Sequence, residues 1–157
     1  MIRGGSGILQ GDILNICPLG IISFHHGDSD FYRGGPPGFW EVYKQESSTG
    51  FVIQRLTEDL DGGDVIFKGH IPTSFFYKLN VCKLFLKSSI FMHKTLEKIS
   101  LNVSKVDYYT PKKGTYKIYR IPKFYQSIFY LIKTSIIISK KLLDKLFGRY
   151  YRWNVCY

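Results

Sequence analysis

One segment, residues 21–64, determines what we expect of the rest of the chain, and it reads IISFHHGDSDFYRGGPPGFWEVYKQESSTGFVIQRLTEDLDGGD. A short apolar strand runs into two histidines, His25 and His26. A glycine-rich loop, a helix, a second strand and an acidic turn follow. An open α/β sheet places its chemistry beyond the carboxyl ends of its strands. A histidine at a strand end, with an aspartate turn further along, therefore predicts a functional site in this segment.

The motifs of this segment resemble the catalytic half of the folate-dependent formyltransferases, the family of glycinamide ribonucleotide, methionyl-tRNA and amino-sugar formyltransferases. The family pattern has a strand ending Asn-x-His, an Arg-Gly loop eight residues later, a helix with Trp, a Thr-Gly-led strand and a Leu-Asp-Thr/Gly-Gly turn. The matching residues are His25, Arg33-Gly34, Pro37, Trp40, Thr49-Gly50 and Leu60-Asp61-Gly62-Gly63. The resemblance covers residues 2–99. It departs from the pattern at Ser23, where the family has Asn.

This resemblance implies an α/β fold, a partial Rossmann-like formyltransferase sheet that is mostly parallel, extended by a C-terminal helix, hairpin and helix. We expect residues 1–100 to be the C-terminal half of the catalytic domain and 101–121 a hairpin-like connector. Residues 122–148 should form a basic amphipathic helix, and 149–157 the start of a further segment. The family fold begins with a βαβ half that would precede Met1, so we expect the chain to be a fragment.

The resemblance also implies a reaction, the transfer of a formyl group from 10-formyltetrahydrofolate to a primary amine. His25 would stabilise the oxyanion and shuttle a proton, while Asp61 would pair with His25 and relay the proton of the amine. Ser23 stands where the Asn of the family donates to the oxyanion. Serine has one donor on a shorter side chain, and the loss of one such donor costs about 10²–10³-fold in rate.

Two sets of binding residues follow from the same resemblance. The pterin end of the folate would lie against Leu56, Glu58, Asp59 and Leu60. The acceptor would contact the loop of Arg33, Gly34 and Gly35, although this loop can equally serve only the backbone, because glycine adopts conformations that other residues avoid. We expect a small-molecule amine acceptor, an amino sugar or a similar metabolite, since the few short strands cannot build the extra β-barrel of the methionyl-tRNA enzymes.

The order of apolar and turn residues predicts the elements. We expect helices at 11–16, 39–44, 73–99 and 122–147, the last stopped by Gly148, and strands at 21–25, 50–56 and 65–70. A hairpin is predicted from 102–109 and 114–121, and a strand at 150–157. Helical spacing predicts two apolar stripes, Phe75, Leu79, Cys82, Phe85/Leu86, Ser89/Ile90 and Leu96 in one helix, and Tyr125, Ile128/Phe129, Ile132, Ile136, Leu143 and Leu146/Phe147 in the other.

Charge is distributed unevenly along the chain, which carries a net charge of +10. Residues 1–70 hold 5 basic and 9 acidic side chains, and residues 71–157 hold 17 and 3. Such asymmetry fits an anionic partner or a membrane surface, but it also fits lysines on solvated helix faces. The lysines are spread out and form no compact patch of the kind that binds nucleic acid, so we expect no nucleic-acid partner.

Cysteine usage favours a cytoplasmic protein with reduced thiols, because Cys17, Cys82 and Cys156 are far apart and odd in number. We expect no metal site, since His25 and His26 are neighbours on a strand and point to opposite faces. The apolar run 124–139 is too short for a membrane span.

Two alternatives to an active enzyme stay open. Ser23 and the missing half of the donor pocket favour a non-catalytic formyltransferase-like remnant. The basic helix at 122–148 could contact an anionic membrane surface or pack on the domain. The oligomeric state does not follow from the sequence.

Overall fold

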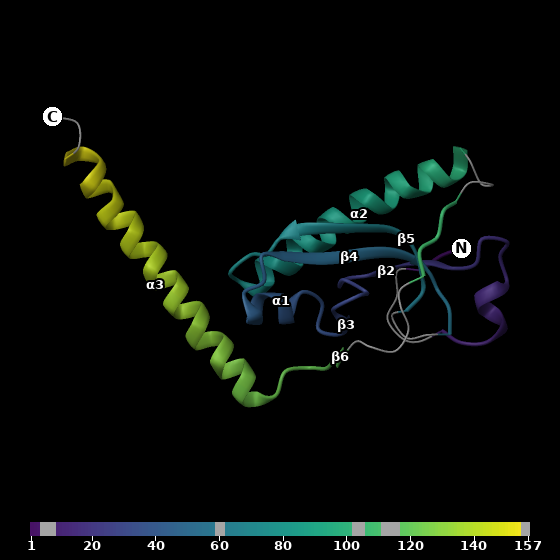
Figure 1. Ribbon diagram of the computed structural model, residues 1–157, viewed down its shortest axis with the longest axis horizontal. Helices are drawn as coiled ribbons and strands as arrows, with labels where there is room; N and C mark the ends of the chain where they lie inside the picture. Colours follow the sequence, from purple (N-terminus) through teal and green to yellow (C-terminus); the bar gives the residue numbers. More distant parts are fainter. Residues whose placement is uncertain (4–8, 59–61, 102–105, 111–116, 155–157) are drawn as a thin grey trace. The chain divides into compact units, whose positions relative to one another are not determined.

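The computed structural model describes residues 1–3, 9–58, 62–101, 106–110 and 117–154, in two compact units, Met1–Ile121 and Pro122–Tyr157. The elements of the first unit are β1 (Ile2–Arg3), the 3₁₀ helix η1 (Asp12–Asn15), β2 (Ile22–His25), β3 (Arg33–Gly34), α1 (Phe39–Lys44), β4 (Ser48–Arg55), β5 (Asp64–Pro72), α2 (Tyr77–Leu101) and β6 (Ile118–Tyr119) (Figure 1). The second unit contains α3 (Phe124–Asn154).

Four strands form the main sheet in the order β1-β2-β4-β5. β1 is parallel to β2, whereas β2 and β4 are antiparallel, as are β4 and β5. The α/β class is confirmed, but the predicted mostly parallel sheet is wrong for these strands. The short connection between β4 and β5 explains part of this, because a parallel pair needs a crossover of a dozen or more residues.

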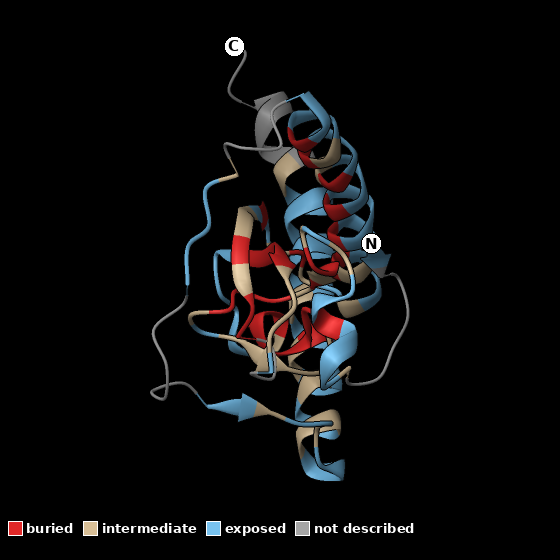
Figure 2. Ribbon diagram, turned by 90° about the vertical axis from the view of Figure 1, so that its right-hand side faces the viewer, coloured by how far each residue is buried: buried red, intermediate tan, exposed pale blue. Residues whose placement is uncertain are grey.

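The two faces of the sheet differ in character. Side chains alternate along each strand, and Ile22 and Ile53 pack with Met92 and Ile99 of α2 in one hydrophobic cluster. A second cluster joins the sheet to the same helix through Phe51, Ile71 and Leu84. Figure 2 shows buried residues in the strands and along one side of α2. The opposite face of β2 therefore presents its polar residues.

Helix α2 buries a different stripe from the predicted one. Its buried residues are Asn80, Leu84, Ser88, Met92, Thr95 and Ile99. The predicted positions Leu79 and Leu86 are 41% and 63% exposed. Hydropathy misplaces the face because the polar members of the stripe are hydrogen-bonded. Asn80, for example, accepts from the Ser74 N–H and donates to the Gly38 carbonyl and to Thr49 Oγ1.

The predicted hairpin at 102–109 and 114–121 lies partly outside the described residues, since 102–105 and 111–116 are not described. Where the connector is described, its partners are elements of the first unit. β6 pairs in parallel with β3, and Tyr109 forms a bridge with Val65 of β5. Pairing of the described connector residues with β3 and β5 was not predicted.

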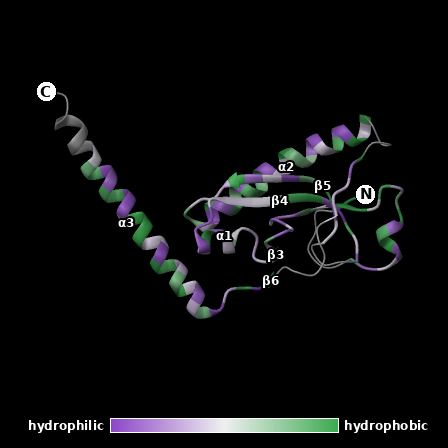
Figure 3. Ribbon diagram, viewed as in Figure 1, coloured by the Kyte–Doolittle hydropathy of each residue, from purple (hydrophilic) through white to green (hydrophobic). Residues whose placement is uncertain are grey.

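The last helix is longer than predicted. α3 continues through Gly148 to Asn154, so the stop at Gly148 and the strand from 150 are wrong, while 155–157 lie outside the described residues. Apolar and polar residues alternate along α3 (Figure 3), and apolar positions such as Ile132 and Leu143 are exposed. Among the helices that the structure describes, none is long and apolar enough to span a membrane.

Candidate active site

The polar face of β2 carries the predicted histidine and serine. Ser23 and His25 alternate with apolar residues, so both point away from α2, and each is 7% exposed. In the antiparallel register Ser23 lies opposite Gln54 of β4, and His25 lies opposite Val52. Opposite residues of an antiparallel pair share a face. Ser23, His25 and Gln54 therefore lie on one surface at the carboxyl end of β2.

The loop after β2 fixes the ring of His25. The Nε2 atom donates to the carbonyl oxygen of Tyr32 at 2.9 Å, so this nitrogen carries a proton. Gly27 is required for that closure, since a Cβ there would lie 2.8 Å from Nε2 of His25. The same hydrogen bond ties the histidine to Tyr32, whose ring lines the neighbouring cavity.

His26 faces the other way, as predicted. Its ring stacks on Phe85 of α2 with centroids 3.9 Å apart, and its Nε2 lies 3.0 Å from Ser88 Oγ. Burial, with a smaller contribution from the charge of His25, lowers the pKa of His26 to about 4. A neutral imidazole packed against α2 cannot act as a substitute donor for the reaction on the other face.

Lys68 organises a charged cluster beside the site. Its Nζ lies 2.7 Å from carboxylate oxygens of both Asp28 and Asp30, and Nε2 of His70 lies 3.1 Å from Asp28. Burial alone would raise the pKa of Asp28, but hydrogen bonds from Lys68, the Asp30 N–H and His70 hold it below its ordinary value. A Cβ at Gly50 would lie 2.8 Å from Cβ of Asp28, so the loop packs directly on β4.

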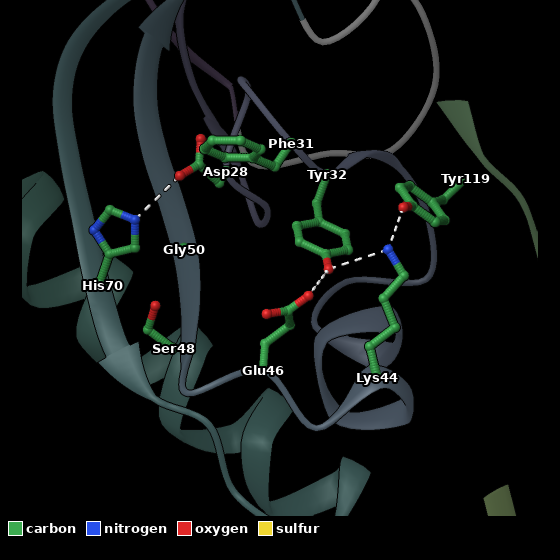
Figure 4. Close-up of a pocket in the computed structure, with 9 residues that line it drawn as sticks. All are labelled: Asp28, Phe31, Tyr32, Lys44, Glu46, Ser48, Gly50, His70 and Tyr119. Carbon is green, nitrogen blue, oxygen red and sulfur yellow. Dashed lines mark hydrogen bonds and ion pairs between the residues drawn. The ribbon is translucent and has the colours of Figure 1, made fainter. Parts of the chain in front are cut away.

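A cavity of about 500 Å³ opens next to this cluster. Figure 4 shows Asp28 and His70 on one side and a chain of Tyr32, Glu46, Lys44 and Tyr119 on the other. The Lys44 Nζ lies 4.7 Å from the centroids of both tyrosine rings, and Tyr32 donates to Glu46 at 2.8 Å. Burial and Glu46 raise the pKa of Tyr32, which keeps its hydroxyl protonated. The lining offers carboxylates, one cation and aromatic faces.

Glu41 is a buried acid that the sequence did not indicate. It lies on α1 with 2% exposure, and its Oε1 has no hydrogen-bond partner among the described residues. Burial raises the pKa of Glu41 to about 7, and the charge of His25 acts in the opposite direction. Electrostatic coupling therefore links this carboxyl to the site histidine. Across the described part of the chain, no group of His, Cys, Asp or Glu could hold a metal ion.

The remaining predicted site residues have varied outcomes. Arg33 donates to the Ser29 carbonyl at 2.7 Å, and Gly34 has a φ of 86° in the strand that pairs with β6. These contacts support a backbone role for the loop, and acceptor binding by Arg33, Gly34 and Gly35 stays a prediction. Folate binding by Leu56 and Glu58 also stays a prediction. Three predicted residues lie outside the described part, Asp59, Leu60 and Asp61.

Comparison with known proteins identifies relatives for part of the chain. No protein-family model matches it. Over 68 residues, which is 43% of this chain, it is 34% identical to a methionyl-tRNA formyltransferase from Solibacter usitatus, and the match covers 22% of that relative. The chain thus spans about a fifth of the length of the curated relatives that it matches.

Solved structures share the fold. An N-formyltransferase from Helicobacter canadensis, in complex with folinic acid and dTDP-3-aminofucose, superposes with a TM-score of 0.56 at 13% identity, covering 72% of this chain and 46% of that one. A methionyl-tRNA formyltransferase from Clostridium thermocellum superposes with a TM-score of 0.52 at 17% identity, covering 81% and 57%. The resemblance to the folate-dependent formyltransferases is thereby confirmed for part of the chain.

Proposed function

We propose that this chain carries the histidine side of a formyltransferase site, which transfers a formyl group from 10-formyltetrahydrofolate to the primary amine of a small acceptor. The observation that carries the proposal is the placement of His25. It is buried on the polar face of β2, at the carboxyl end of the strand, within a segment whose fold and sequence match formyltransferases. The donor assignment is supported by the folinic acid bound to the H. canadensis protein.

His25 acts on the oxygen of the formyl group in this proposal. As the amine attacks the carbonyl carbon, negative charge develops on that oxygen, and a fixed donor stabilises it. Because Nε2 already donates to Tyr32, donation from Nδ1 requires a protonated ring. A carboxylate at Asp61 would favour that protonated form and would accept the proton that the amine loses. The tetrahedral intermediate then collapses as the bond between the formyl carbon and N10 of the folate breaks, and the relayed proton passes through His25 to N10, which leaves as tetrahydrofolate.

The proposed acceptor pocket is the cavity lined by Tyr32, the residue whose carbonyl oxygen accepts a hydrogen bond from His25. Its carboxylates at Asp28 and Glu46 and the hydroxyl of Ser48 can bind the hydroxyl and amino groups of a sugar, and the ring of Tyr32 offers an apolar face. Small-molecule sites combine such apolar walls with a few polar groups. The dTDP-3-aminofucose of the H. canadensis complex supports an amino-sugar acceptor, and the methionyl-tRNA relatives supply the alternative to test.

The test is a transfer assay on the complete translation product of the reading frame that contains this chain. We expect formyl transfer from 10-formyltetrahydrofolate to an amino-sugar nucleotide, and none to methionyl-tRNA. His25→Ala should lower kcat by about 10²–10⁴-fold. The matched control His93→Ala, on the exposed surface of α2 with a side chain 77% exposed, should keep full activity. Equal activity of both variants would refute the assignment, and transfer to methionyl-tRNA alone would refute the small acceptor.

A further inference from the structure

We propose that the side-chain amide of Gln54 is a second oxyanion donor of this site, beside His25, and takes the role for which Ser23 is too short. This inference rests on the proposed formyl transfer, and it assigns a catalytic residue that lies on a different strand from His25. Gln54, a long amide on β4, lies opposite the small Ser23 of β2.

The strand register places Gln54 correctly for this role. Gln54 lies directly opposite Ser23 in the antiparallel pair, and the Cβ atoms of such a pair are about 4.5–5.5 Å apart on the same face. His25 follows two residues later on that face. A glutamine side chain is longer than serine and ends in an amide with two N–H donors. It can therefore occupy the space above Ser23, next to the imidazole.

The oxygen of this buried amide has an unmet capacity to accept a hydrogen bond. Gln54 is 2% exposed, and its Oε1 has no partner among the residues that the structure describes. An unsatisfied buried polar atom destabilises the fold, and a strand residue such as valine at this position would avoid that cost. Rotation about the last side-chain bond is roughly two-fold, so the amide can turn until N–H takes the place of this unpartnered oxygen and donates to an incoming oxyanion.

Two features of the neighbouring backbone mark the position of Gln54. The register of β4 with β5 shifts at this residue, since Ile53 pairs with Phe67 but Gln54 pairs with Val65. The extra residue of this bulge is Ile66 on β5, so Gln54 lies beside a break in the β4–β5 ladder, and bulges are frequent next to active sites. A Cβ on Gly63 would lie 3.2 Å from Cδ of Gln54, so the amide also contacts the turn that follows Asp61. Gln54 thus lies between the Ser23 position and the acidic turn.

Substitution by a residue of the same length tests the role. In the transfer assay above, Gln54→Met removes the amide and should lower kcat by about 10²–10³-fold, with the KM values of donor and acceptor nearly unchanged. The thermal midpoint should not fall, because the Oε1 that the variant removes has no partner among the described residues and methionine keeps the length of the side chain. Gln10→Met, at an exposed position, is the matched control and should behave as the wild type.

A second variant separates catalysis from structure. Gln54→Met combined with Ser23→Asn restores an amide on β2, and it should recover at least about tenfold of the lost kcat if the amide itself is needed. Unchanged kcat in Gln54→Met would overturn the inference while leaving the proposed function intact. A loss that tracks a lowered thermal midpoint and is not rescued would also overturn it. A wild-type protein without transfer activity would remove the proposed function and this inference together.

Discussion

Glu41→Gln should stabilise the fold at alkaline pH and leave it nearly unchanged at acid pH. The carboxyl is 2% exposed, and burial raises its pKa from 4.5 to about 7. Each pKa unit corresponds to about 1.4 kcal/mol, so ionisation of Glu41 in the folded state costs about 3 kcal/mol. Glutamine has the shape of the neutral acid and carries no such cost.

The stability of the fold changes with pH because Glu41 binds its proton more tightly in the folded state than in the unfolded state. Between pH 4.5 and about 7 the folded protein keeps the proton of Glu41 while the unfolded chain releases it. Stability therefore falls as the pH rises through this window. Below about pH 4 Glu41 is protonated in both the folded and the unfolded state, so it makes no pH-dependent contribution to the free energy of unfolding. Above about pH 7 both states are ionised and the whole cost is present, so the benefit of a glutamine in place of the acid is largest there.

Urea unfolding at about pH 4.5 and about pH 8.5 measures the effect. We expect Glu41→Gln to gain about 3 kcal/mol in the free energy of unfolding at the higher pH, and little at the lower. Glu97→Gln on α2, where the side chain is 62% exposed, is the control and should change neither value. A loss of stability at both pH values, or the same gain at both, would refute a buried neutral acid.

Two further predictions concern the packing around the site. Asn80→Ala should lower the free energy of unfolding by about 3 kcal/mol, because it leaves the Ser74 N–H, the Gly38 carbonyl and Thr49 Oγ1 without their buried partner. Urea unfolding measures this loss, and a loss below about 1 kcal/mol would contradict the prediction. Gly50→Ala should lower the free energy of unfolding by roughly 1–3 kcal/mol and slow formyl transfer, because the added Cβ would displace Asp28. The control Gly148→Ala, whose Cβ meets no atom within 4 Å, should do neither. A Gly50→Ala protein with wild-type stability and activity would show that the loop is not held against β4.

Local features of the site could be predicted from the sequence because they depend on neighbouring residues. α1 has the predicted bounds, Phe39 to Lys44, and is flanked by Gly38 and Gln45, both at positive φ. Strand alternation correctly placed His26 on the face opposite His25. These features follow from the alternation of residues along one strand or from a turn-forming residue next to one helix, both of which are local in the sequence.

Features that depend on distant pairing could not be predicted. The buried face of α2 contains Asn80, whose amide donates to the distant Gly38 carbonyl. It also contains Ser88 and Thr95, which donate to carbonyls one turn earlier in the helix, so hydropathy alone does not identify them as buried. The antiparallel register of β2 with β4 brings Gln54 opposite Ser23. No spacing in the sequence indicates that pairing. The sequence therefore showed that Ser23 replaces the Asn of the family, but it did not show that Gln54 could compensate for the lost donor.

The most direct test of a formyl-transfer site at His25 is an NMR titration of the four histidine imidazoles with 5-formyltetrahydrofolate, a stable analogue of the donor. A site at the carboxyl end of β2 predicts that the His25 resonances shift with saturable dependence on the folate, while those of His93 stay in place. Saturable binding that shifts His93 or no histidine, or the absence of binding by the complete translation product, would contradict it.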